Sequence, residues 1–103
     1  MDKHTPGPWR ITTDFIGVYD KDARCIADMD SESAHEIGYD ESLANARLIA
    51  AAPDLLAALE AVIDDLREGI QDAVDNGANE IWVANARKRL MNARAAIRKA
   101  RGD

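Results

Sequence analysis

The sequence predicts an α+β fold, in which a short three-stranded antiparallel sheet is followed by a short helix and a long antiparallel helical hairpin. Three observations support this prediction. β-branched and aromatic residues are grouped before residue 29. Apolar residues recur at helical spacing between residues 42 and 100. Pro53 and Gly77 fall where one helix would begin and another would end.

The length and composition indicate one globular domain, residues 1–103. The chain is 47% hydrophobic and 31% charged, which is ordinary for a folded protein. Because it contains two Trp, two Tyr and one Phe, its core must consist mostly of aliphatic side chains.

The N-terminal region begins with an extended lead-in, residues 1–8. The run "HTPGPW" places two prolines around a glycine and cannot form a helix. A β-meander over residues 9–28 follows, with "DKDA" as turn chemistry between its second and third strands. The expected strands are Trp9–Thr13, Ile16–Tyr19 and Arg24–Asp28.

The phase of these strands is open, because both Cys25/Ala27 and Ile26 could occupy the inner face. We predict that the inward residues are Trp9, Ile11, Ile16, Val18 and Ile26. Cys25, the single cysteine, is then interpreted as a buried strand residue that forms no intrachain disulfide.

Residues 29–41 are predicted to form an exposed acidic loop, since the run "DSESAHEIGYDE" has few apolar residues. An acidic surface suits the basic grooves of nucleic-acid-binding proteins. The candidate partner-binding carboxylates are Asp28, Asp30, Glu32, Glu36, Asp40 and Glu41.

A short helix is expected over residues 42–51, with Ser42 or Asp40 as its cap. The residue before a proline is disfavoured in helical geometry, so Ala52 should mark a break or a sharp kink. Pro53 would then begin the first helix of the hairpin, residues 53–75.

The hairpin is predicted from two heptad seams, one in residues 53–75 and one in residues 80–100. Gly77 supplies a helix C-terminus and Asn79 caps the next helix. The first seam contains Leu56, Leu59, Ile63, Leu66, Ile70 and Ala73, and the second contains Val83, Ala86, Leu90, Ala93 and Ile97. Trp9 and Trp82 are expected to close the ends of the core, whereas an exposed tryptophan would indicate a partner surface.

The net charge of −6 argues against general binding to nucleic acid or to anionic membranes. Basic residues nevertheless concentrate after residue 86, opposite an acidic first hairpin helix, so pairing across the hairpin is the expected role of both. The alternative is phosphate binding, for which Arg47, Arg87 and Arg94 are the candidate anion contacts.

Catalytic and cofactor-binding patterns do not emerge from the sequence. His4, His35 and Cys25 are too scattered to suggest a metal site or a nucleophile with its base. No glycine-rich phosphate-binding loop is present. We therefore expect a protein that is not an enzyme and uses no cofactor. The start of the chain does not resemble a signal peptide, so a cytoplasmic location is expected.

The runs "HTPGPW", "IADMD" and "ANARLIAAAPDLL" together resemble a group of small accessory proteins encoded by bacteriophages and prophages. The resemblance covers about the first 60 residues. The last 40 residues, which include the basic helix, look like the part that varies within this group. It implies no catalytic residues.

The resemblance implies a protein that acts on host factors, as inhibitors of bacterial immunity such as anti-CRISPR proteins do. We expect stoichiometric inhibition of a host defence or regulatory factor by protein–protein interaction. The alternative is an oligomeric sponge that sequesters a nucleotide-type immune signal. A homodimer is expected in either case, because alanine-rich helices approach closely and a thin sheet leaves apolar surface uncovered.

Overall fold

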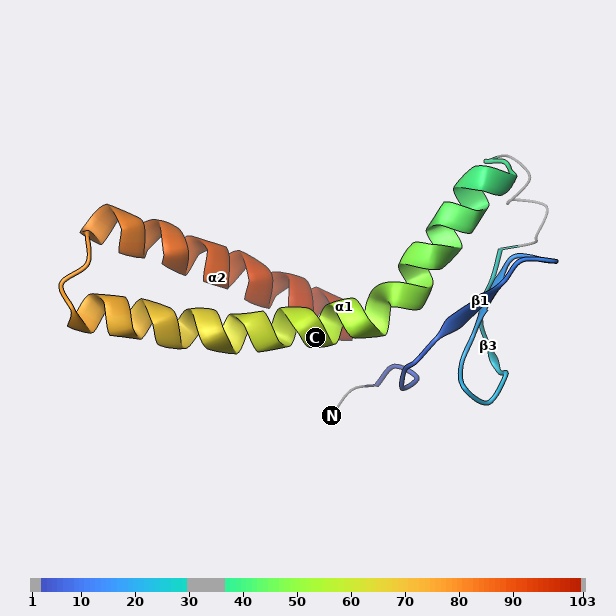
Figure 1. Ribbon diagram of the computed structural model, residues 1–103, viewed down its shortest axis with the longest axis horizontal. Helices are drawn as coiled ribbons and strands as arrows, with labels where there is room; N and C mark the ends of the chain where they lie inside the picture. The colour runs from blue at the N-terminus through green and yellow to red at the C-terminus, as the bar shows by residue number, and fades with distance from the viewer. Residues whose placement is uncertain (1–2, 30–36, 103) are drawn as a thin grey trace. The chain divides into compact units, whose positions relative to one another are not determined.

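The computed structural model describes residues 3–29 and 37–102 and confirms the predicted α+β fold. Three short strands, β1 (Arg10–Thr12), β2 (Gly17–Tyr19) and β3 (Cys25–Asp28), precede two helices, α1 (Tyr39–Asp75) and α2 (Glu80–Arg101) (Figure 1). Of the candidate residues, Asp30, Glu32, His35 and Glu36 lie outside the described part. The chain divides into two compact units, residues 3–55 and residues 56–102, which we describe separately.

The sheet of the first unit is an antiparallel meander in the order β1-β2-β3. Val18 pairs with Ile11 on one side and with Ala27 on the other. A register shift between Val18 and Tyr19 leaves Ile26 as an additional residue on β3, because the next pair is Tyr19 with Cys25. This irregularity explains why both Ile26 and Ala27 are partly buried, which strict alternation does not allow.

The core of the first unit contains the predicted inward residues. Ile16, Val18 and Ala46 are buried, and the first part of α1 contributes Leu43, Ile49 and Ala50. The five predicted inward residues all belong to this cluster, and Ala27 and Met29 join it. The prediction for Cys25 was wrong, since its thiol is exposed on β3. Cys25 pairs with Tyr19 on the other side of the extra residue Ile26. The extra residue shifts the alternation of inward and outward side chains, so Cys25 faces outward.

The lead-in is held in place by short-range contacts within the first unit. The Trp9 indole Nε1 donates to the Thr5 carbonyl at 3.2 Å, and the His4 ring meets the Trp9 ring edge-on. The Gly7–Pro8 peptide bond is cis. A Cβ placed on Gly7 would lie 3.0 Å from the Cβ of Pro53. Gly7 of the run "HTPGPW" therefore lies directly against Pro53 of α1.

The assignment of α1 contradicts a break at Ala52, the first of the two alternatives predicted there. The helix is assigned without interruption from Tyr39 to Asp75, with Pro53 inside it, so residues 42–51 and 53–75 are one helix. Proline removes one backbone donor and crowds the preceding turn at a cost of about 3 kcal/mol. The alanines and leucines on either side are the strongest helix formers and offset that cost.

The beginning of α1 also differs from the prediction. Residues 39–41 are helical, so the expected loop over residues 29–41 is shorter than predicted at its C-terminal end. Ser42 is not a cap: it is buried inside the helix, and its N–H donates to the Gly38 carbonyl at 3.1 Å. Asp40 and Glu41 occupy the first turn, where a carboxylate is favoured by the helix dipole.

The second unit is the antiparallel hairpin that the two heptad seams predicted (Figure 1). Ten of the eleven seam residues belong to one apolar cluster, in which Ile63, Ile70, Val83, Ala86, Leu90 and Ile97 are buried. The turn follows the expected chemistry. Gly77 has a positive φ of 75°, and the Asn79 side chain caps α2 by accepting from the N–H groups of Ile81 and Trp82.

Asp20, which the sequence analysis missed, organises the β2–β3 turn. Its side chain is 1% exposed and accepts from the backbone N–H groups of Asp22 and Arg24, both at 2.9 Å. Arg24 Nε donates to the second carboxylate oxygen at 2.8 Å. Together these donors lower the pKa of Asp20 below its usual 3.8, the backbone N–H of Arg24 most, against the opposing effect of burial.

The first prediction concerns the pH dependence of stability. A carboxylate whose pKa is lowered by folding stabilises the folded state above its unfolded pKa, and this contribution is lost as the pH falls through its folded pKa. We expect Asp20→Asn to lower the Tm at pH 7, and the difference from the wild type to shrink as the pH falls below 3.8 and to disappear once the pH is below the folded pKa of Asp20. Circular dichroism melts across this pH range measure the effect, with the exposed Asp22→Asn as control. A Tm difference that persisted at the lowest pH would contradict the account.

The second prediction compares two glycines. Gly7→Ala should destabilise the protein by about 1–3 kcal/mol, because the new Cβ would overpack against Pro53. Gly69→Ala should stabilise it by about 0.5–1 kcal/mol, because Gly69 lies inside α1 and a Cβ there meets no atom within 4 Å. Urea unfolding of both variants gives the two free energies. Equal effects of the same sign would refute the Gly7–Pro53 contact.

Candidate functional site

The hairpin presents charges of opposite sign on its two helices. Within residues 56–75, α1 carries six carboxylates and one arginine, whereas α2 carries seven basic residues and Glu80. Five of the six carboxylates are exposed and occupy positions away from the apolar seam: Asp64, Asp65, Glu68, Asp72 and Asp75. We call these five the acidic face.

Pairing across the hairpin involves little of this charge. Between the described residues of α1 and α2, the structure records one ion pair, in which Arg101 Nη2 lies 2.7 Å from Glu60 Oε2. Both side chains are 35% exposed, so the pair contributes about 1 kcal/mol or less. The expectation that the basic run is matched within the chain was therefore right for Arg101 and Glu60 and wrong for most of the other charges.

The seam geometry explains this outcome. Glu60 follows the seam residue Leu59, and Arg101 is four residues beyond the seam residue Ile97, so both flank the seam and can meet. Asp65, Glu68, Asp72 and Asp75 lie on the side of α1 away from the seam. Asp64 borders the hollow that Arg94, Arg98 and Arg101 line, but no ion pair is recorded between it and a described residue of α2. Their charge is available to another molecule.

The three candidate anion-binding arginines are divided between the two units, and the two in the second unit line different hollows. Arg47 lies in the first unit and is exposed on α1. Arg87 lines a hollow of about 710 Å³ beside the hairpin turn, and Arg94 lines another of about 290 Å³ towards the C-terminal end of α2. Arg98 and Arg101, which the sequence analysis did not select, share the second hollow with Glu60 and Asp64.

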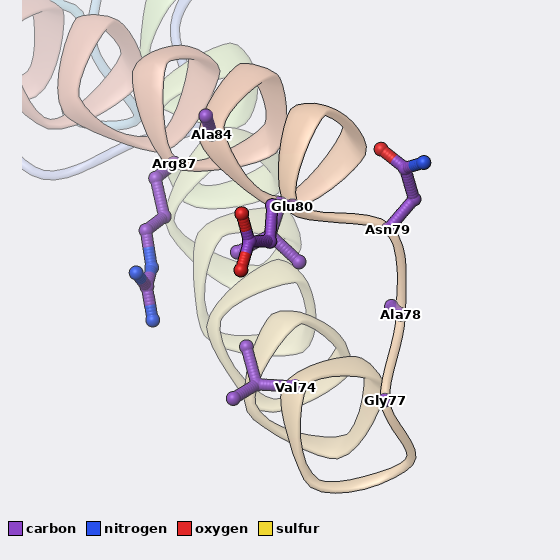
Figure 2. Close-up of a pocket in the computed structure, with 8 residues that line it drawn as sticks. Val74, Gly77, Ala78, Asn79, Glu80, Ala84 and Arg87 are labelled. Atoms are coloured by element: carbon purple, nitrogen blue, oxygen red, sulfur yellow. The ribbon is translucent and has the colours of Figure 1, made fainter.

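The hollow beside the turn has mixed chemistry (Figure 2). The backbone of Gly77 and Ala78 forms one wall, and Glu80 and Arg87 of α2 place charges of opposite sign along it. The Asn79 amide oxygen, which could otherwise receive a ligand, accepts from Ile81 N at 2.8 Å and from Trp82 N at 3.3 Å. An arginine beside a glutamate does not provide the convergent positive charge that a phosphate group requires.

The predicted carboxylates of the first unit are exposed where they are described. Asp28 ends β3, and Asp40 and Glu41 lie in the first turn of α1. Because carboxylates in a first helical turn are favoured by the helix dipole, stability alone accounts for Asp40 and Glu41. The acidic face of the hairpin has no such explanation, since its residues lie in the middle and at the C-terminal end of α1.

Trp82 departs from its predicted role. Its side chain is 50% exposed and does not close the end of the core, because it flanks the seam residue Val83 and α1 does not cover it. The neighbouring Ile81 is 73% exposed. Trp9, in contrast, packs on the core of the first unit as predicted. An exposed Trp–Ile pair beside a turn is the kind of surface that partners bind.

Groups suited to catalysis are dispersed. His4 Nδ1 lies 2.9 Å from the Thr5 carbonyl oxygen, and Cys25 is on the sheet. Within the described ranges, no three acidic, histidine or cysteine side chains are grouped so that they could hold a metal ion. The described helices are also not apolar enough over sufficient length to cross a membrane.

Comparison with known proteins relates the chain to a phage protein family. No curated protein and no solved structure matches the chain. A family model described as Salmonella phage P22 protein Y8K6 matches residues 1–103. The match extends through α2, beyond the first 60 residues whose motifs suggested a phage protein. The chain therefore belongs to the Salmonella phage P22 protein Y8K6 family.

Proposed function

We propose that this phage protein is a non-catalytic inhibitor that binds a basic surface of a host defence or regulatory protein through its acidic face. The observation that supports this proposal most is that these five carboxylates are exposed and make no ion pair with a described residue of α2. Charges that fold stability does not require are available for recognition.

The physical basis is electrostatic complementarity. Proteins that bind nucleic acid present positively charged grooves, and an acidic helix competes for such a groove. Complementary charge accelerates association and excludes partners of the wrong sign, while apolar anchors supply most of the affinity. The exposed Ile81 and Trp82 are suitable anchors on the same unit, at the end of the hairpin where α2 begins. In the first unit, Asp28, Asp40 and Glu41 form the described part of a second acidic surface.

The alternative, an oligomeric sponge for a nucleotide-type immune signal, would require Arg47, Arg87 and Arg94 to meet across subunits. No observation within the described residues favours it, because Arg87 and Arg94 line two different hollows and the hollow beside Arg87 also contains Glu80.

The proposal predicts that charge reversal on the acidic face abolishes binding without unfolding the protein. The test variant is Asp64→Lys/Asp65→Lys/Glu68→Lys, used as bait for capture from the bacterial host and expressed in cells challenged with a phage that their defence restricts. We expect loss of the captured host protein by about tenfold or more, with loss of plaquing rescue, while circular dichroism stays unchanged.

The matched control reverses three exposed charges on the other helix, Lys88→Glu/Arg89→Glu/Lys99→Glu, and should keep both activities. A second variant, Asp40→Lys/Glu41→Lys, tests the acidic surface of the first unit separately. Capture and rescue that survive reversal of the acidic face would refute the proposed role of that face.

A further inference from the structure

A second apolar stripe runs along α1 within the first unit, on the side that does not cover the sheet. It consists of Ala44, Leu48, Ala51 and Leu55, at spacings of four, three and four residues. Leu48 is 66% exposed and Leu55 is 54% exposed. This spacing is that of a coiled-coil seam. Single exposed apolar residues are common on protein surfaces, but these four are aligned on one face of the helix.

The stripe is not required by the core of its own unit. The residues of α1 that pack on the sheet are Leu43, Ala46, Ile49 and Ala50, which lie on another face of the helix. The lead-in contacts α1 at Pro53, which also belongs to that other face. The stripe thus remains uncovered within the described part of the first unit.

We infer that this stripe is the interface of an antiparallel homodimer, in which it packs against the same stripe of a second copy. The first argument is size complementarity. When two copies of α1 are antiparallel and centred between residues 49 and 50, Leu48 faces Ala51 of the second copy and Leu55 faces its Ala44. Each large side chain then meets a small one, so the helices can approach closely without a void. A parallel pair in register would place leucine on leucine and alanine on alanine.

The second argument is charge complementarity. Arg47 and Asp54 each precede a leucine of the stripe by one residue, so both lie on the same flank of the seam. In an antiparallel pair, equivalent flanks face each other, and Arg47 of each copy meets Asp54 of the other. Two-fold symmetry produces this ion pair twice. In a parallel pair, the flank that contains Arg47 would face the opposite flank of the second copy. That opposite flank contains Asn45 and Ala52 and carries no charge, so no ion pair would form.

Neither charge has another described role. Arg47 and Asp54 are exposed, and the structure records no ion pair between either of them and another described residue. Asp54 lies in the middle of α1, where a carboxylate gains nothing from the helix dipole. The dimer is independent of the proposed inhibitory function, which uses carboxylates of the second unit.

The test measures the solution mass by light scattering after size-exclusion chromatography over a dilution series. The wild type should show twice the 11.3 kDa of one chain at high concentration. Leu48→Glu should give a monomer at every concentration, with an unchanged circular dichroism spectrum, because the residue it replaces is exposed. Arg47→Glu should raise the Kd of the dimer by about tenfold, since it converts two attractions into two repulsions.

The deciding variant is the charge swap Arg47→Glu/Asp54→Arg, which restores both pairs in the opposite sense and should return the Kd to that of the wild type. Arg67→Glu makes the same charge change elsewhere on α1 and should leave the dimer intact. A wild-type monomer, a dimer that survives Leu48→Glu, or a swap that fails to restore the Kd would each overturn the inference.

Discussion

The apolar seam between α1 and α2 is the interaction on which the second unit depends. Leucine and isoleucine form the seam of α1, and branched aliphatic residues alternate with alanine along the seam of α2. Burial of these side chains contributes about 25 cal/mol for each Å² of apolar surface removed from water. The recorded ion pair across the seam contributes far less than this burial. Because the seam alone accounts for the hairpin, the outer faces are free to carry charge for other purposes.

Helix α1 packs against different elements in the two units. In the first unit it covers the sheet with Leu43, Ala46, Ile49 and Ala50, and in the second unit it pairs with α2 through the heptad seam. A helix with several apolar faces needs small residues, which explains why the run Ala44 to Glu60 contains seven alanines. Pro53 fits within it because the helix formers on both sides offset its cost, and its ring packs on Gly7.

Periodicity predicted the parts of this fold that depend on burial. The seam residues, the Asn79 cap and the Gly77 turn follow directly from spacing and local chemistry, as do the three strands. The errors arose where tertiary context decides the outcome. The sequence gives no sign that Gly7 supports Pro53, that β3 contains an irregular step at Ile26, or that Asp20 accepts three hydrogen bonds. Of the candidate site residues, those of the acidic loop that fall within residues 30–36 are not described.

The seam holds the hairpin together, whereas the acidic face is free to serve recognition. The free energy of unfolding of a variant in which the five carboxylates of that face are replaced by their amides tests it most directly. Exposed charges contribute a few tenths of a kcal/mol each, so the account predicts a value within about 1 kcal/mol of the wild type, or above it as repulsion is relieved. A loss of several kcal/mol would contradict the account, because it would show that the fold itself requires these charges.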